Sequence, residues 1–196
     1  MQKPIIIGIT GGIGGGKTTF SNRLRECEQL VFDTDLEAKK LQNDDENVKK
    51  ELKQLFGENI YQNQILDRKR IAKLVFENKD LLAKLNQIIH PRVKNNFQEW
   101  VKKHNNHNYL FMECAILFEG KFDVYVDKIL VITAPENVRI ERVMKRDNQT
   151  EEQVRARMRN QISENEKIKN ATWVIETDGI KNTQEKVDAF LKKLSE

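Results

Sequence analysis

The chain has 196 residues, a length that suits one domain or one core with an insertion. Hydrophobic residues make up 38% of it, and 34 Lys and Arg against 30 Asp and Glu give a net charge of +4. Both signs of charge are interspersed, and so mild a basic balance suits an anionic ligand but does not indicate a nucleic-acid partner. Because Cys27 and Cys114 have no CxxC partner and no apolar run approaches the roughly 18 residues of a membrane span, we expect a cytoplasmic protein with neither a disulfide framework nor a membrane partner.

The first elements form a β-α-β unit. Residues 4–10 are a short β-branched run between a proline and several glycines, which predicts a buried parallel strand. Residues 17–28 have a helical pattern, and residues 30–32 are a second short strand that leads to Asp33. A strand, a helix and a strand in this order are typical of an α/β fold.

The next segment, residues 36–103, is helical almost throughout. Apolar residues such as Val93 and Phe97 recur at helical spacing, and residues 59–66 form a polar connector. Pro91 can occupy the first position of a helix, so we expect one helix to end and another to begin near it. So long a stretch before the next strand predicts a helical insertion into the α/β core.

Strands and helices alternate over the rest of the chain. We expect, in chain order, strands over residues 109–113 and 128–133, a helix from Pro135 to about Arg146, a helix with a capping box formed by Thr150 and Gln153, a strand over residues 173–175, and a final helix with Val187, Phe190, Leu191 and Leu194 on one face. This alternation predicts an α/β fold in which a mostly parallel sheet of five strands is flanked by helices.

The segment between the first strand and the first helix fits G-x-x-x-x-G-K-[ST], the phosphate-binding P-loop pattern. Glycines let consecutive backbone N–H groups turn inward, and the N-terminus of the following helix adds donors and a partial positive charge. Lys17 is expected to reach the β- and γ-phosphates of a nucleoside triphosphate, and the Thr18 hydroxyl to ligate Mg²⁺. The residues expected to bind the nucleotide here are Gly12, Ile13, Gly14, Gly15, Gly16, Lys17, Thr18 and Thr19.

Two carboxylates, Asp33 and Asp35, follow the second strand. Ligands of an open α/β sheet bind beyond the carboxyl ends of its strands, so we expect both near the mouth of the P-loop. One can orient an acceptor hydroxyl and take its proton, and the other can help to hold Mg²⁺ through water. The alternative is that Asp33 only caps the helix that follows, but beside a P-loop we favour a function for at least one of the pair.

Two arginine-rich helices joined by a short polar turn are typical of a lid that closes over a phosphoryl group. Arginine can donate two parallel hydrogen bonds to phosphate and keeps its charge at any working pH. The alternative is a solvated helix face on which Glu141, Glu151 and Glu152 pair with arginines, and we expect most of the arginines at the surface and one or two to be catalytic. The set comprises Arg139, Arg142, Arg146, Arg155, Arg157 and Arg159.

The tripeptide His90-Pro91-Arg92 is the last candidate site. A basic residue in the first turn of a helix gains nothing from the helix dipole, so Arg92 suggests an anionic partner. A capping histidine with a solvated arginine explains the same spacing equally well.

Together these motifs resemble the dephospho-coenzyme A kinase family over nearly the whole chain. The matching segments, in chain order, are Thr10 to Thr18, Asp33-Thr34-Asp35, Leu66-Asp67-Arg68 with Val75-Phe76, His90-Pro91, Ile116-Leu117-Phe118-Glu119, Arg142 to Arg146-Asp147, and Val174-Ile175 with Asp178-Gly179. The order and spacing of these segments are more specific than any one of them.

The resemblance implies a P-loop kinase of three parts that uses ATP and Mg²⁺ to phosphorylate the ribose 3′-hydroxyl of dephospho-CoA. A nucleotide-binding core would comprise residues 1–35, 105–134 and 170–196. A helical insertion over residues 36–104 would bind the acceptor, and a helical lid would span residues 135–169.

The resemblance also implies roles for individual residues. Asp35 would be the general base, and Lys17 and Arg142 would stabilise the transferring phosphoryl group. Asp178 and Gly179 would lie near the adenine. The residues expected to bind the acceptor are Asp33, Asp35, His90 and Arg92.

Three other functions fit parts of the pattern. The nearest is another small-molecule P-loop kinase with a nucleoside, nucleotide or shikimate-like acceptor, but about 65 residues of helix before the third strand leave room for a bulkier one. A regulatory GTPase or motor-type ATPase is disfavoured because the D-x-x-G and N-K-x-D motifs are missing. The balanced charge disfavours a nucleic-acid-binding module.

Overall fold

The computed structural model describes residues 3–76, 78–177 and 182–196. Asp178 and Gly179, which the family resemblance implies to lie near the adenine, are therefore outside the described residues.

The chain divides into two compact units. One unit comprises Met1–Asp33 and His104–Glu196, and it is called the sheet unit because it contains the large β-sheet. The other, Thr34–Lys103, is called the helical unit. Each unit has its own buried apolar core.

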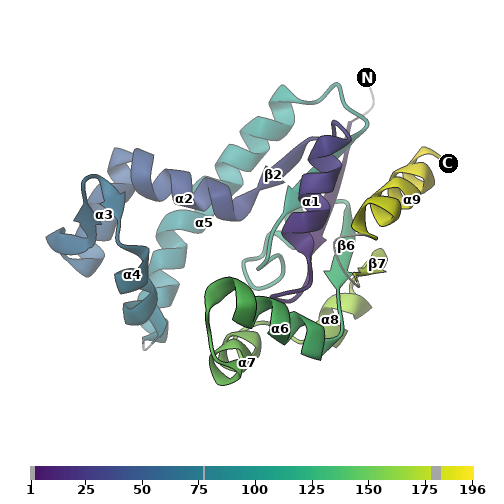
Figure 1. Cartoon of the computed structure of the whole chain (residues 1–196). Coiled ribbons are helices and arrows are strands. Elements are labelled where there is room, and N and C mark those ends of the chain that lie inside the picture. Colours follow the sequence, from purple (N-terminus) through teal and green to yellow (C-terminus); the bar gives the residue numbers. More distant parts are fainter. Residues whose placement is uncertain (1–2, 77, 178–181) are drawn as a thin grey trace. The chain divides into compact units, whose positions relative to one another are not determined.

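A five-stranded parallel sheet forms the centre of the sheet unit (Figure 1). Its strands, in spatial order, are β2 (Val31–Asp33), β5 (Tyr109–Glu113), β1 (Ile5–Thr10), β6 (Lys128–Thr133) and β7 (Trp173–Glu176). Every neighbouring pair is parallel, and β1 lies between β5 and β6, so the strand that leads into the glycine motif is central. The predicted α/β fold with a parallel sheet of five strands is confirmed.

Two helices cover one face of this sheet, α1 (Lys17–Glu26) and α9 (Thr183–Ser195). Ile7 and Ile9 of β1 are buried in one apolar cluster with Phe20 of α1 and Phe190 of α9. The two phenylalanine rings meet edge to face with centroids 6.1 Å apart. This packing fixes α1, and with it the helix N-terminus that follows the glycine motif.

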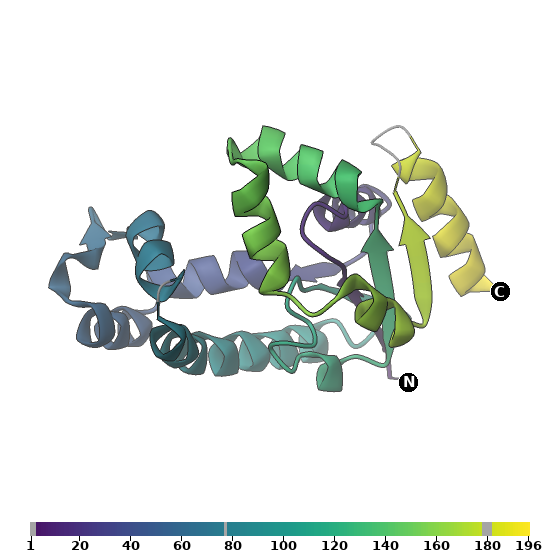
Figure 2. The ribbon, with the colours of Figure 1, turned by 90° about the horizontal axis from the view of Figure 1, so that it is seen from below.

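Three shorter helices follow β6, namely α6 (Glu136–Asp147), α7 (Glu151–Arg159) and α8 (Glu164–Lys169). The predicted capping box is present: Thr150 Oγ1 accepts a hydrogen bond from the Gln153 N–H at 3.3 Å, and Gln153 Oε1 accepts one from the Thr150 N–H at 3.0 Å. Ile140, Val143 and Val154 bury a small cluster between α6 and α7. Figure 2 shows the chain passing from α7 through a short connector into α8.

Over its described residues, 34–76 and 78–103, the helical unit comprises four helices, one 3-10 turn and a small hairpin: α2 (Thr34–Asp44), α3 (Glu46–Phe56), η1 (Glu58–Ile60), β3 (Tyr61–Gln62), β4 (Ile65–Leu66), α4 (Arg68–Phe76) and α5 (Lys79–Lys103). α2, α3 and α4 each pack against α5, which buries Ile89, Val93 and Phe97. The polar connector predicted from the sequence is the β3–β4 hairpin, and its turn residues Asn63 and Gln64 have φ angles of +49° and +68°. Asparagine tolerates this left-handed region better than most residues.

The prediction that a helix begins at Pro91 is wrong, because Pro91 lies inside α5. A proline in a helix interior removes one backbone hydrogen bond and costs about 3 kcal/mol. Pro91 is exposed, whereas Ile89 and Val93 on either side of it belong to the buried stripe of α5. Packing of that stripe against the neighbouring helices therefore outweighs the local preference of the proline.

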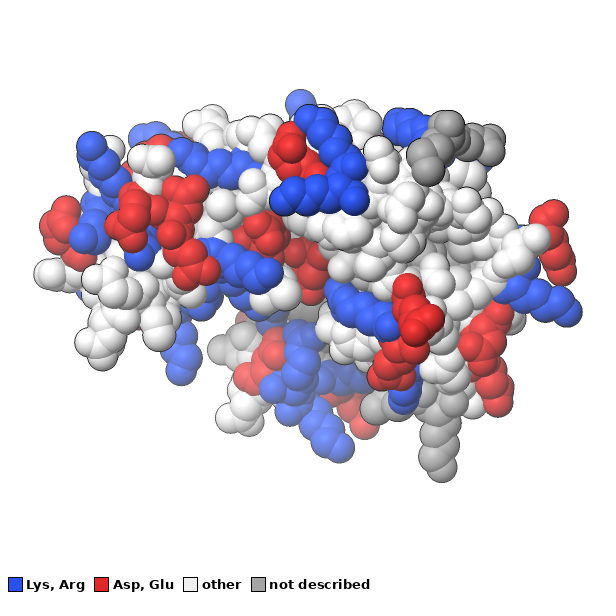
Figure 3. All heavy atoms as spheres, turned by 90° about the horizontal axis from the view of Figure 1, so that it is seen from above, with Lys and Arg blue, Asp and Glu red and all other residues white. Residues whose placement is uncertain are grey.

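Charges of both signs cover the outside of the molecule. On the face drawn in Figure 3, Lys and Arg side chains lie among Asp and Glu side chains. Within the described parts of the chain, no helix is both long enough and apolar enough to cross a membrane.

Candidate active site

The glycine motif forms a loop between β1 and α1. Gly11, Gly14 and Gly16 have φ angles of +148°, +81° and +96°, which side chains with a Cβ rarely adopt. A Cβ on Gly11 would lie 1.9 Å from the carbonyl oxygen of Ile132 in β6. The glycines are therefore required both by backbone angle and by the close packing of the loop on the sheet.

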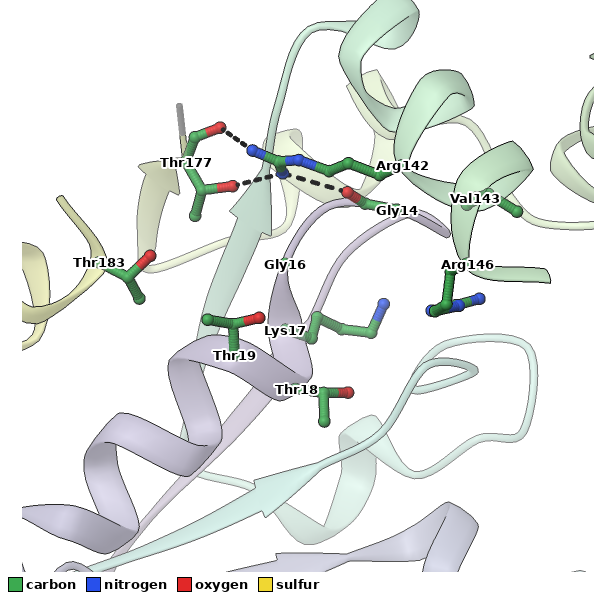
Figure 4. Close-up of a pocket in the computed structure, with 10 residues that line it drawn as sticks. All are labelled: Gly14, Gly16, Lys17, Thr18, Thr19, Arg142, Val143, Arg146, Thr177 and Thr183. Atoms are coloured by element: carbon green, nitrogen blue, oxygen red, sulfur yellow. Dashed lines mark hydrogen bonds between the residues drawn. The ribbon is translucent and has the colours of Figure 1, made fainter. Parts of the chain in front are cut away.

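A cavity of about 440 Å³ opens on the inner side of this loop (Figure 4). It is lined by Gly14, Gly16, Lys17, Thr18, Thr19, Arg142, Val143, Arg146, Thr177 and Thr183. Its volume lies within the range of small-molecule sites in proteins. Five of the eight loop residues predicted to bind the nucleotide line it, while Gly12, Ile13 and Gly15 lie outside that lining.

Lys17 is held in the first turn of α1. Its ammonium group donates to the carbonyl oxygens of Gly11 at 2.8 Å and Gly12 at 3.3 Å, so the charge lies over the loop itself. A half-buried cation at the N-terminus of a helix makes the cavity attractive to anions.

Carboxylates converge at the carboxyl ends of β2 and β5. The Thr18 hydroxyl donates to Glu113 Oε1 at 2.8 Å, and Arg25 lies 3.7 Å from Glu113 Oε2. Asp33 is the partner of Glu113 in the β2–β5 register. Burial raises the pKa of Glu113, and the negative charge of Asp33 adds to that rise, while the hydrogen bond from Thr18 opposes it.

Glu113 is a site residue that the sequence analysis did not single out. It is the last residue of the buried run at 109–113, and that strand pairs with the strand leading into the P-loop. An acidic residue that ends a buried strand beside a P-loop was the available signal.

Arg142 crosses from α6 to the glycine loop, as Figure 4 shows. One terminal nitrogen donates to the carbonyl oxygen of Gly14 at 3.3 Å and to Thr177 Oγ1 at 3.0 Å, and the other donates to the Thr177 carbonyl at 3.3 Å. Thr177 Oγ1 in turn donates to the Gly15 carbonyl at 2.9 Å. Arg142 thus joins α6, the loop and the segment after β7.

The other arginines of this region have different surroundings. Asp147 accepts bonds from both Arg146 and Arg157, and the bond from Arg146 is the main reason that the pKa of Asp147 lies well below its usual value. Arg155 is exposed and pairs with Glu136 and Glu151, as expected for a solvated face. Arg139 is the exception, because it is buried.

The predicted acceptor residues of the helical unit lie on two helices. Asp35 is exposed in the first turn of α2, and His90 and Arg92 lie on α5. Arg92 donates to Glu51 Oε1 at 2.6 Å and to the Ile88 carbonyl at 2.6 Å. Burial is the main cause of the lowered pKa of His90, which favours the neutral imidazole.

The fold and the loop define the class of the protein. Shikimate kinase from Acinetobacter baumannii, solved in complex with shikimate, superposes with a TM-score of 0.58 over 97% of this chain and 93% of its own, at 16% identity. That likeness concerns the fold alone. Together with the glycine motif, it defines a P-loop fold.

Closer relatives define the family. The family model described as dephospho-CoA kinase matches residues 5–183. The dephospho-CoA kinase of Bacteroides fragilis is 40% identical over 177 residues, which is 90% of this chain and 86% of the relative. The crystal structure of TT1252 from Thermus thermophilus, 38% identical, superposes with a TM-score of 0.85 over 98% of this chain and 99% of that protein. The chain belongs to the dephospho-CoA kinase family, as its motifs indicated.

Proposed function

We propose that this protein transfers the γ-phosphoryl group of ATP to the ribose 3′-hydroxyl of dephospho-CoA, which yields coenzyme A and ADP in the last step of coenzyme A biosynthesis in the cytoplasm. The observation that carries the proposal is the cavity at the glycine loop, which Lys17 and Thr18 line from the first turn of α1. Family membership supplies the acceptor.

The donor phosphates bind to the inner side of the loop. Gly14, Gly16 and Thr19 line the cavity together with Lys17, so backbone N–H groups, the helix N-terminus and one ammonium act on the same anion. Arg142 lines the same cavity and stabilises the charge of the transferring phosphoryl group. Asp178 and Gly179 take part in binding the adenine.

Mg²⁺ suits the oxygen atoms that meet at the strand ends. The Thr18 hydroxyl would ligate the ion, and the adjacent carboxylates of Glu113 and Asp33 would hold its waters, because Mg²⁺ prefers hard oxygen ligands and keeps several waters. When bound, the ion neutralises charge on the phosphates.

The acceptor is bound by residues that follow β2 and by the helical insertion over residues 36–104. Residues 135–169 act as the lid over the nucleotide-binding core, which comprises residues 1–35, 105–134 and 170–196. Asp35 lies two residues beyond the end of β2 and is exposed, as a general base that meets a substrate hydroxyl must be. Asp33, His90 and Arg92 complete the acceptor set.

A coupled assay with ATP and Mg²⁺ tests the proposal. Dephospho-CoA, adenosine, AMP and shikimate are offered separately to the purified protein, and ADP formation is measured. We expect turnover with dephospho-CoA alone. Phosphorylation of adenosine, AMP or shikimate without turnover of dephospho-CoA would replace the proposal by another small-molecule kinase activity.

A further inference from the structure

The glycine loop is held by the segment that joins α7 to α8, on the part of the loop that does not line the cavity. This segment is the connector of residues 160–163 together with Glu164, the first residue of α8. Gln161 Oε1 accepts a hydrogen bond from the Ile13 N–H at 3.0 Å. Glu164 Oε2 accepts one from the Gly12 N–H at 3.1 Å. Two successive amides of the loop are therefore bound by side chains 152 and 148 residues further along the chain.

Arg139 fixes the Glu164 carboxylate. Its terminal nitrogen lies 3.0 Å from the same oxygen that binds Gly12, and the two side chains are only 9% and 18% exposed. A Cβ on Gly12 would lie 2.0 Å from that arginine nitrogen and 2.5 Å from the glutamate oxygen. The Arg139–Glu164 pair therefore packs directly on the backbone of Gly12 and leaves no room for a side chain there.

The connector is also anchored away from the loop. The Ile162 N–H donates to Glu119 Oε1 at 3.1 Å, and this carboxylate oxygen lies 3.5 Å from the ammonium of Lys167, which is completely buried. Gln161 and Glu164 therefore project from a segment that is itself fixed on both sides.

These contacts divide the loop into two halves. The amides of Gly12 and Ile13 are taken by protein side chains, whereas Gly14 and Gly16 line the cavity. A carboxylate so near a polyphosphate site would repel the ligand if it were not neutralised, and the Arg139 guanidinium supplies that neutralisation.

We propose that Glu164, held and neutralised by Arg139, and Gln161 are positioning residues that keep the outer half of the glycine loop in place, so that its inner half is preorganised for the nucleotide phosphates. The proposal rests on the proposed function only in that the ligand of the loop is ATP. A loop that is already in its binding conformation loses less free energy on binding, so these residues act on ATP affinity and leave the acceptor unaffected.

Four variants of the full chain test this, with ATP affinity measured by titration calorimetry in the presence of Mg²⁺. Glu164→Ala removes the acceptor of the Gly12 amide and is expected to raise the Kd of ATP about tenfold. Gln161→Ala removes the acceptor of the Ile13 amide and is expected to raise it about threefold. Glu164→Gln keeps an acceptor oxygen and is expected to remain within about twofold of the unchanged protein.

Glu166→Ala is the matched control, because Glu166 is an exposed glutamate on the same helix, whereas the amides of Gly12 and Ile13 donate to Glu164 and Gln161. We expect its Kd for ATP to be unchanged. In steady-state assays, Glu164→Ala and Gln161→Ala should raise the KM for ATP and leave the KM for dephospho-CoA unchanged.

The outcomes separate this proposal from the proposed function. If the unchanged protein binds ATP and both alanine variants bind it equally well, the positioning role is refuted while the function stands. If Glu164→Ala does not fold, Gln161→Ala decides: a raised Kd supports the role and an unchanged Kd overturns it. If the unchanged protein does not bind ATP, the proposed function itself fails.

Discussion

The two units of the molecule use their charged side chains differently. In the sheet unit, three charged side chains from different elements lie around the glycine loop: Lys17 of α1, Glu113 of β5 and Arg142 of α6. Each is held by hydrogen bonds to backbone or hydroxyl groups. In the helical unit, charged groups form local pairs between or along helices, such as Arg92 with Glu51 and Lys102 with Glu99. The sheet unit therefore contains a preorganised site built from several elements, whereas these charged groups of the helical unit form separate pairs.

This difference sets the size of effect expected from a substitution. Groups fixed around a site act in the transition state without reorganisation, so their removal is costly for catalysis. Exposed ion pairs contribute little to stability, and their removal is expected to be nearly silent.

Lys17→Ala should have the largest effect, a loss of kcat on the order of 10³-fold, because it removes the cation that the loop holds over the cavity. The fold should be retained, since the hydrogen bonds from the ammonium to Gly11 and Gly12 stay within the loop that precedes α1. Turnover in the coupled assay and circular dichroism check both points. Lys102→Ala on the surface of α5 is the control, and near-normal turnover of Lys17→Ala would remove Lys17 from the mechanism.

Asp35→Asn should lower kcat on the order of 10²-fold, because asparagine cannot take the proton of the acceptor hydroxyl. Asp44→Asn at the other end of the same helix α2 is the matched control, as Asp44 is also exposed. Equal kcat values for the two variants would show that Asp35 is not the base. The exposed carboxylate at the start of α2 would then have no part in removing the proton of the acceptor hydroxyl.

Arg142→Ala should cost about tenfold in kcat/KM for ATP, since it removes a charged donor from the cavity and frees the Gly14 carbonyl. Arg155→Ala is the control, because Arg155 is exposed and pairs only with neighbouring glutamates of α6 and α7 among the contacts described. A change in thermal stability alone would mean that Arg142 braces the loop and takes no part in catalysis.

Local patterns in the sequence predicted much of the sheet unit. The strands Tyr109–Glu113 and Lys128–Thr133 and the capping box at Thr150 follow from residues that are adjacent or three apart in the chain. The glycine loop likewise follows from one contiguous motif, and the structure has a cavity beside it.

Features that depend on distant contacts could not be predicted in this way. Pro91 continues a helix because three other helices bury the stripe around it. The contact between Gly12 and Glu164 joins residues 152 positions apart, and no local pattern identifies one carboxylate of α8 as its partner. Glu113 became a candidate only when its strand was found beside β1.

The smallest expected effect concerns stability and compares the two units directly. Burial raises the pKa of Glu113, so the folded protein binds that proton more tightly than the unfolded chain does. Stability from this group is present at low pH and is lost as the pH rises through its raised pKa. Glu113→Gln does not titrate there, so its free energy of unfolding relative to the unchanged protein should increase as the pH rises above 4.5, the ordinary value for glutamate.

Glu99→Gln in the helical unit should behave in the opposite way. The hydrogen bond from Lys102 lowers the pKa of Glu99, so this glutamate contributes stability above its ordinary pKa that is lost as the pH falls. Because Glu99 is exposed, its contribution should be slight. Urea denaturation of both variants and the unchanged protein between about pH 4 and pH 8 gives the free energy of unfolding at each pH and so measures the two trends. If this free energy depends on pH in the same way for Glu113→Gln and the unchanged protein, the ionised Glu113 carboxylate is not destabilised by its burial.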